Sequence, residues 1–145
     1  MKETKRFTTW RNRWEDQTDM DEIEYINDTI HPEDLLIIGK LIFPELIECR
    51  SGVFLKRNFS DQIAVQLSTP EEVIRLERDI NSVKMYDLFS RCNDAEESTF
   101  EQIGELLRSS WQMLLSSKHP DKNFNVQLII SENNYGPILT FHQVI

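Results

Sequence analysis

Apolar residues recur every three or four positions in several stretches of the chain, which is the spacing of one helix face. We expect amphipathic helices over residues 21–30, from Pro70 onward, and over residues 98–117. Thr69 and Ser98 each stand three positions before a glutamate, which is the capping-box pattern of a helix start. The expected inner faces are Ile23, Ile26 and Ile30; Val73, Leu76 and Ile80; and Phe100, Ile103, Leu107, Trp111, Leu114 and Leu115.

The most apolar part of the chain runs from His31 to Lys56. Pro32 suits a first helical turn, and the acidic pair that follows it favours the positive end of the helix dipole. Residues 35–38 and 41–43 are then apolar on nearly every side of a helix that Pro44 ends. A helix that is apolar all round is typical of a buried position. We therefore expect this helix at the centre of the core, and the predicted core residues are Leu36, Ile42, Phe54, Leu107 and Trp111.

Strands are expected where apolar positions alternate or form short runs. Residues 46–49 and 53–55 flank a turn that contains Gly52, and Asp61–Ser68 alternates as a half-buried strand would. Residues 124–130 and 138–145 form a second hairpin around a turn at 131–137. Residues 83–90 fit either a strand or a continued helix, and we favour a strand or an irregular connection.

These elements predict an α+β fold with an antiparallel sheet of about five or six strands, packed by two or three main helices. A length of 145 residues favours a single domain over residues 1–145. Residues 1–20 look like a peripheral arm, in which Phe7, Trp10 and Trp14 could share one face of a short helix.

The charge is distributed unevenly along the chain, whose formal net charge is -9. Residues 1–13 hold five basic and one acidic side chain, whereas residues 14–34 hold nine acidic and no basic side chains. Such an acidic stretch attracts basic partners and repels phosphate, although a solvated face that maintains solubility is the plainer interpretation. We therefore expect no binding to nucleic acid, despite the basic residues beside Trp10.

No apolar run approaches the ~20 residues of a membrane span, and the N-terminal residues have no apolar region typical of a secretory signal. Cys49 and Cys92 do not make a disulfide framework, and Cys49 is expected to be a buried thiol. A cytoplasmic, monomeric or weakly dimeric protein without membrane contact is the prediction.

Catalytic and metal-binding signatures are missing from the sequence. His31, His119 and His142 do not have the spacing of helical metal ligands, and neither cysteine belongs to a CxxC pair. The chain has no GxSxG, P-loop or GxGxxG motif. We expect no cofactor, no metal and no enzymatic activity, with an unrecognised hydrolase as the third choice among the functions considered.

The stretch LLIIGKLIFPELIECRSGVFLK, residues 35–56, resembles small immunity proteins of bacterial contact-dependent growth inhibition and related polymorphic toxin systems. The likeness lies in a compact helix, a proline and a strand pair joined by a glycine. The resemblance implies a protein that binds one cognate toxin domain, often a basic nuclease, and blocks its active site. The runner-up is an acidic adaptor or regulatory subunit that docks a basic protein.

A partner would meet acidic side chains around an aromatic or aliphatic anchor. Two surfaces are candidates: one in the acidic stretch, and one in the polar loop before the last long helix. The residues are Asp19, Asp21, Glu22, Glu24 and Asp28, with Tyr25 as anchor, and Asp94, Glu96 and Glu97 on the second surface.

Overall fold

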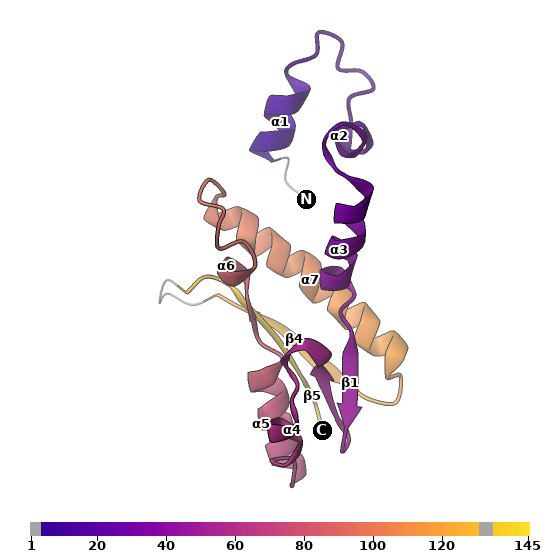
Figure 1. The fold of residues 1–145 in the computed structure, drawn as a ribbon, viewed down its shortest axis with the longest axis vertical. Coiled ribbons are helices and arrows are strands. Elements are labelled where there is room, and N and C mark those ends of the chain that lie inside the picture. Colours follow the sequence, from indigo (N-terminus) through magenta and orange to yellow (C-terminus); the bar gives the residue numbers. More distant parts are fainter. Residues whose placement is uncertain (1–3, 131–134) are drawn as a thin grey trace. The chain divides into compact units, whose positions relative to one another are not determined.

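The structure is a computed structural model that describes residues 4–130 and 135–145 (Figure 1). The chain divides into two compact units, Met1–Gly39 and Lys40–Ile145, which we call unit 1 and unit 2. The boundary falls inside helix α3, Pro32–Ile42.

Unit 1 contains α1, Lys5–Arg11, and α2, Glu22–Thr29, followed by the first part of α3. The buried side chains of α1 are Phe7 and Trp10, and both pack edge-on against the ring of Tyr25 in α2. The Trp10 indole nitrogen also donates a hydrogen bond of 2.7 Å to the Asp28 carboxylate. The predicted helix in residues 21–30 is confirmed, and a small aromatic cluster packs α1 against α2. The predicted inner face of this helix is wrong, because Ile23 and Ile26 are 62% and 41% exposed.

Helix α3 forms where the apolar run predicts it, but the predicted burial is wrong. No residue of α3 is fully buried, and Leu36 is 72% exposed. Ile42 is half-buried and packs against the main core of unit 2. The aromatic side chains of α1 and α2 pack against one another, so they do not cover the apolar side chains of α3.

After the last residues of α3, unit 2 continues with a hairpin of β1, Leu46–Cys49, and β2, Gly52–Leu55, as predicted. Arg50 and Ser51 form its two-residue turn in the left-handed region, with φ of 48° and 68°. Gly52 opens the buried strand β2, and a Cβ there would lie 2.6 Å from the ring of Phe54. Close packing therefore requires glycine at this position.

The predicted strand Asp61–Ser68 is wrong. After a short 3-10 helix, Lys56–Asn58, the chain forms α4, Asp61–Ala64. Ile63 and Leu67 are four positions apart, so they also suit one side of a helical turn, and both pack in the cluster around Phe54. Val65, which a half-buried strand would place beside them, is 78% exposed.

The remaining elements of unit 2 are two longer helices, a short helix and three strands. They are α5, Pro70–Ile80; β3, Val83–Lys84; α6, Met85–Leu88; α7, Glu97–Lys118; β4, Phe124–Ile129; and β5, Ile138–Gln143. The ambiguous stretch 83–90 thus holds a two-residue strand and one helical turn. The predicted hairpin turn at 131–137 includes residues 131–134, which lie outside the described residues.

The two predicted helix starts differ in outcome. The Thr69 hydroxyl accepts a hydrogen bond from the Glu72 amide and caps α5, as predicted. The capping box at Ser98 is wrong, because α7 begins at Glu97 and its N-cap residue is Glu96. Glu97 therefore lies in the first helical turn and outside the polar loop.

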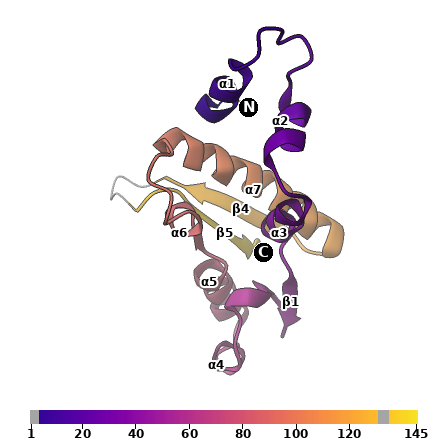
Figure 2. The ribbon, with the colours of Figure 1, turned by 45° about the horizontal axis from the view of Figure 1, so that its top comes forward.

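The main core of unit 2 lies between α7 and the antiparallel sheet β3–β5–β4 (Figure 2). Leu107 and Trp111 of α7 are at most 2% exposed, and Phe54 is fully buried, which confirms these three core predictions. Trp111 also donates a hydrogen bond of 3.0 Å from its indole nitrogen to the Leu41 carbonyl. Gly104 lies so close to Leu128 that a Cβ would come within 2.5 Å of it.

The α+β class is confirmed, whereas one sheet of five or six strands is not found among the described residues. A two-stranded sheet, β1–β2, and a three-stranded sheet, β3–β5–β4, are formed instead. A side chain of α5 bonds to backbone groups of both sheets. Glu77 accepts from the amides of Val53 in β2 and Gln143 in β5, at 2.9 and 3.1 Å.

Asn81, the C-cap residue directly after α5, repeats this arrangement one turn beyond Glu77. Its side-chain oxygen accepts from the Leu55 amide at 2.9 Å, and its nitrogen donates to the carbonyls of Val53 and Phe141 at 2.9 and 3.3 Å. Glu77 and Asn81 are both fully buried. Polar side chains of a helix thus satisfy backbone groups that a neighbouring strand would otherwise pair.

Candidate functional site

Four consecutive apolar side chains of α3 in unit 1 are exposed to solvent. Leu35, Leu36, Ile37 and Ile38 are 45% to 72% exposed, and we call them the apolar turn. Single exposed apolar residues are ordinary on protein surfaces. Four in succession cover most of the circumference of a helix, and an exposed group of this kind is typical of an interaction site.

The local sequence explains why the apolar turn forms. Pro32 occupies the first position of α3, and Glu33 and Asp34 follow in its first turn. The Nδ1 atom of His31 accepts a hydrogen bond of 3.1 Å from the Glu33 amide. Two acidic side chains thus directly precede the apolar turn at the helix start.

Acidic side chains of α2 and the preceding loop are the second exposed feature of unit 1. Asp19, Glu22 and Glu24 are exposed. The Asp16 carboxylate accepts hydrogen bonds from the hydroxyl and the amide of Thr18, which lower its pKa. Because residues 14–34 include no lysine or arginine, this charge is uncompensated within the stretch.

Three predicted contact residues have roles inside unit 1. Asp21 caps α2 by accepting a hydrogen bond of 3.0 Å from the Glu24 amide, and Asp28 accepts a hydrogen bond from the Trp10 indole nitrogen. Tyr25, the predicted anchor, packs against Phe7 and Trp10 and is only half-buried. These contacts give the three residues a structural reason that is independent of any partner.

The second predicted surface surrounds the start of α7 in unit 2. The Cys92 thiol donates to the Asp94 carboxylate at 3.0 Å, and Ser98 lies 3.5 Å from Glu96. Glu97 lines a hollow together with Phe89 and Phe100. Of the three predicted acids, Glu97 therefore lines a partly apolar depression, whereas Asp94 and Glu96 are not among its lining residues.

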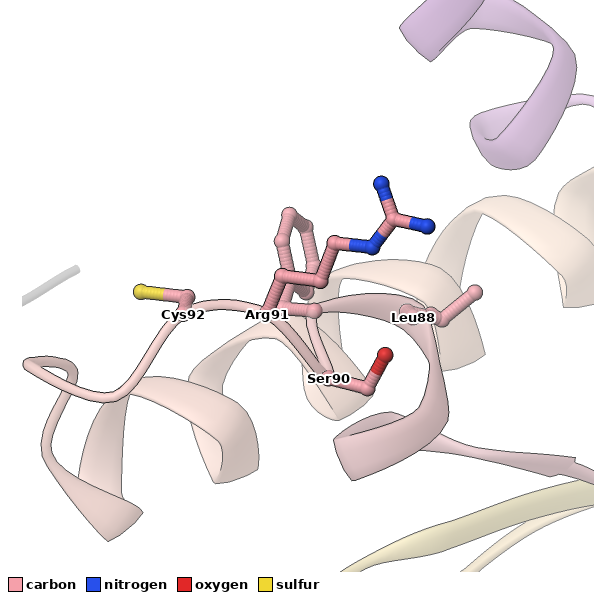
Figure 3. A pocket seen from close by; sticks show the side chains of 5 residues that line it. Leu88, Ser90, Arg91 and Cys92 are labelled. Atoms are coloured by element: carbon pink, nitrogen blue, oxygen red, sulfur yellow. The ribbon is translucent and has the colours of Figure 1, made fainter.

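An adjoining hollow follows α6 and is lined by residues 88–92 (Figure 3). The Arg91 guanidinium and the Cys92 sulfur point in different directions there (Figure 3). Both side chains are exposed, and Cys92 is a free thiol. Cys49 is also free, as predicted, and it packs against the cluster around Phe54, although it is half-buried where a buried thiol was expected.

The histidines lie in separate environments. His31 is at the start of α3, and His119 Nδ1 is 3.6 Å from the Glu48 carboxylate. His142 is buried on β5, where desolvation and the nearby Arg78 guanidinium lower its pKa. No group of three His, Cys, Asp or Glu side chains in the described part of the chain could hold a metal ion.

Sequence reasoning missed the exposure of α3, although a signal for it exists. A helix that is apolar on all sides needs apolar partners on all sides. The residues before it offer the aromatic side chains of residues 7–25, which pack on one another, and the isoleucines of α2, which are themselves exposed. The stretch before α3 is mostly polar and charged, which is the signal that it offers little apolar surface to cover this helix.

Comparison of the chain with protein-family models, characterised proteins and solved structures gave no significant match. Among the helices formed by the described residues, none combines the length and the apolar character that crossing a membrane requires.

Proposed function

We propose that this protein is an immunity protein that binds a cognate, basic toxin domain and neutralises it by covering its active site. The resemblance of residues 35–56 to such immunity proteins supports this function. The observation that carries it is the uncompensated acidic stretch of residues 14–34, with exposed Asp19, Glu22 and Glu24.

The physical argument rests on charge complementarity. A nuclease domain binds phosphate through lysine and arginine, so the surface around its active site is positive. An acidic surface on the inhibitor speeds association with it, and the advantage decreases as salt screens the charges. An inhibitor seated on that surface would also exclude the anionic substrate.

The test uses the protein encoded by the reading frame directly upstream of this protein's gene, which the proposal predicts to carry the toxin domain. We expect coexpression to protect cells from that domain, and the purified pair to associate faster at low salt than at high salt. A complex that forms without protecting cells would favour the adaptor function instead. If neither a complex nor protection is found, the immunity function is contradicted.

Charge reversal then locates the surface. We expect replacement of Asp19, Glu22 and Glu24 by lysine to slow association at low salt by about tenfold or more. A matched control replaces Glu71, Asp87 and Asp121, which are exposed acids of unit 2, and changes the net charge equally. Asp21 and Asp28 are left intact because they stabilise unit 1.

The second surface is tested in the same way, by replacing Asp94, Glu96 and Glu97 with lysine. If this variant associates more slowly with the toxin domain and the Asp19, Glu22 and Glu24 variant does not, the partner binds beside the start of α7. Equal effects of all three triple variants would show that net charge alone, and neither surface, sets the rate.

A further inference from the structure

We propose that the apolar turn of α3, Leu35–Ile38, is the anchor of this interface and inserts into an apolar depression on a protein partner whose surrounding surface is basic. The inference rests on the proposed function and names the part of the surface that supplies affinity. Exposed charges at the rim of an interface add little each, whereas a few buried side chains supply most of the affinity.

The apolar turn has the properties of such an anchor. Its four side chains are already exposed, and the helix that carries them is formed, so little ordering is needed on binding. Leu36 and Ile37 are the most exposed of the four, at 72% and 66%. A partner that covers them removes apolar surface from water without displacing any packed side chain of unit 1.

The charges around the turn determine what can cover it. Glu33 and Asp34 directly precede it in the first turn of the same helix, and Lys40 in the last turn of α3 offsets only one of these two charges. A second copy of this chain would bring an identical set of carboxylates to a two-fold interface, and the like charges would repel. A partner with lysine or arginine around an apolar depression meets the same surface with attraction.

The decisive experiment compares truncations with a matched control. Leu36→Ala and Ile37→Ala, separately and together, remove anchor atoms from an exposed helical turn. Met113→Ala is the control, because Met113 is 67% exposed on α7 in unit 2. Thermal melts verify that every variant is folded.

With the upstream-encoded toxin domain, we expect the double variant to raise Kd on the order of 30-fold or more, mainly through faster dissociation. The Met113 variant should bind as the unsubstituted protein does. If the unsubstituted protein binds the toxin and both variants bind equally well, the anchor is overturned while the immunity function stands.

A second probe keeps the inference testable if the toxin domain does not bind. A synthetic helical peptide with leucines along one face and lysines beside them is compared with one that has glutamates in place of lysines. Selective binding of the lysine peptide that Leu36→Ala weakens supports the anchor. Equal binding of the two peptides, or no binding of either, overturns it.

Sedimentation equilibrium tests the second copy as occupant. We expect no dimer that depends on Leu36 in the unsubstituted protein at low salt. A concentration-dependent dimer that Leu36→Ala abolishes would assign the apolar turn to self-association and overturn the inference of a basic partner.

Discussion

Helix α7 in unit 2 and helix α3 in unit 1 both carry strongly apolar residues, yet they bury them to different degrees. The inner face of α7 meets the sheet β3–β5–β4, so that Leu107 and Leu115 are each 1% exposed. The side chains of the apolar turn of α3 are covered far less by the described residues, and they remain 45% to 72% exposed. Apolar composition therefore leads to burial only where another element supplies complementary surface.

Polar side chains show the same difference between the units. In unit 2, Glu77 and Asn81 are fully buried and bond to backbone groups of β2 and β5. In unit 1, the Trp10–Asp28 hydrogen bond is only partly buried, and it joins one helix to the next. Unit 2 is thus held by contacts between distant segments, whereas unit 1 depends on a small cluster of local ones.

The largest expected loss of stability comes from a substitution in the core of unit 2. Trp111→Ala should lower the free energy of unfolding by about 3–5 kcal/mol, because a large buried side chain is lost. Leu36→Ala should change it by less than about 0.5 kcal/mol, because the side chain is exposed. Urea denaturation followed by far-UV circular dichroism measures both.

If Trp111→Ala does not fold, Trp111→Phe is the milder variant, because it keeps an aromatic ring in the core and removes the hydrogen bond to Leu41 together with part of the ring volume. A loss above about 2 kcal/mol for Leu36→Ala would show that the apolar turn is buried in solution. That result would remove the contrast between α3 and α7.

The next effect concerns the buried carboxylate of α5. Glu77→Ala leaves the amides of Val53 and Gln143 without their acceptor, at a cost of about 1–3 kcal/mol for each unpaired group. Glu71→Ala, an exposed position in the first turn of the same helix, serves as the control. Equal small losses in the two variants, measured by urea denaturation, would mean that other groups or water replace Glu77.

A smaller effect is expected in unit 1. Asp28→Ala removes the acceptor of the Trp10 indole N–H, and the loss should be about 1 kcal/mol. The indole N–H resonance of Trp10 should shift in NMR spectra and exchange faster with solvent. Asp28→Asn retains an acceptor oxygen and should keep the resonance protected, whereas Asp19→Ala should leave it unchanged.

The smallest effect is a dependence of stability on pH that comes from His142. Its pKa in the folded state is lowered by burial and by Arg78, so the unfolded state takes up the proton first as pH falls. Stability from this group is therefore complete above its ordinary pKa of about 6.5 and decreases below it, with a slope of at most about 1.4 kcal/mol per pH unit. His142→Gln should flatten the melting temperature below pH 6.5, and an unchanged slope would contradict this origin.

The elements with strong periodicity could be predicted from the sequence alone. The helices starting near residues 22, 32, 70 and 97, the hairpin around Arg50 and Ser51, and the pairing of β4 with β5 all follow local patterns. These features depend on spacing, prolines and turns within short segments. The acidic stretch with Asp19, Glu22 and Glu24 was equally visible, because charge along the chain needs no fold to be counted.

Some segments fit both the helix period and the strand period, and packing decided which of the two structures they form. Ile63 and Leu67 fit a strand or a helical turn, and their contacts in the cluster around Phe54 select the turn. The split into two sheets was also beyond sequence reasoning, because it depends on Glu77 and Asn81 reaching both β2 and β5. Such contacts join residues that are far apart in the chain, and no local sequence pattern predicts them.

The chain by itself determined that residues 32–42 form an apolar helix with an acidic first turn, because helix propensity and capping act within a few positions. Only the tertiary structure decided that Leu41 and Ile42 pack against the core of unit 2 while Leu35–Ile38 stay exposed. Burial is a property of a side chain together with whatever lies opposite it. What lies opposite is set by elements elsewhere in the chain, or by a partner.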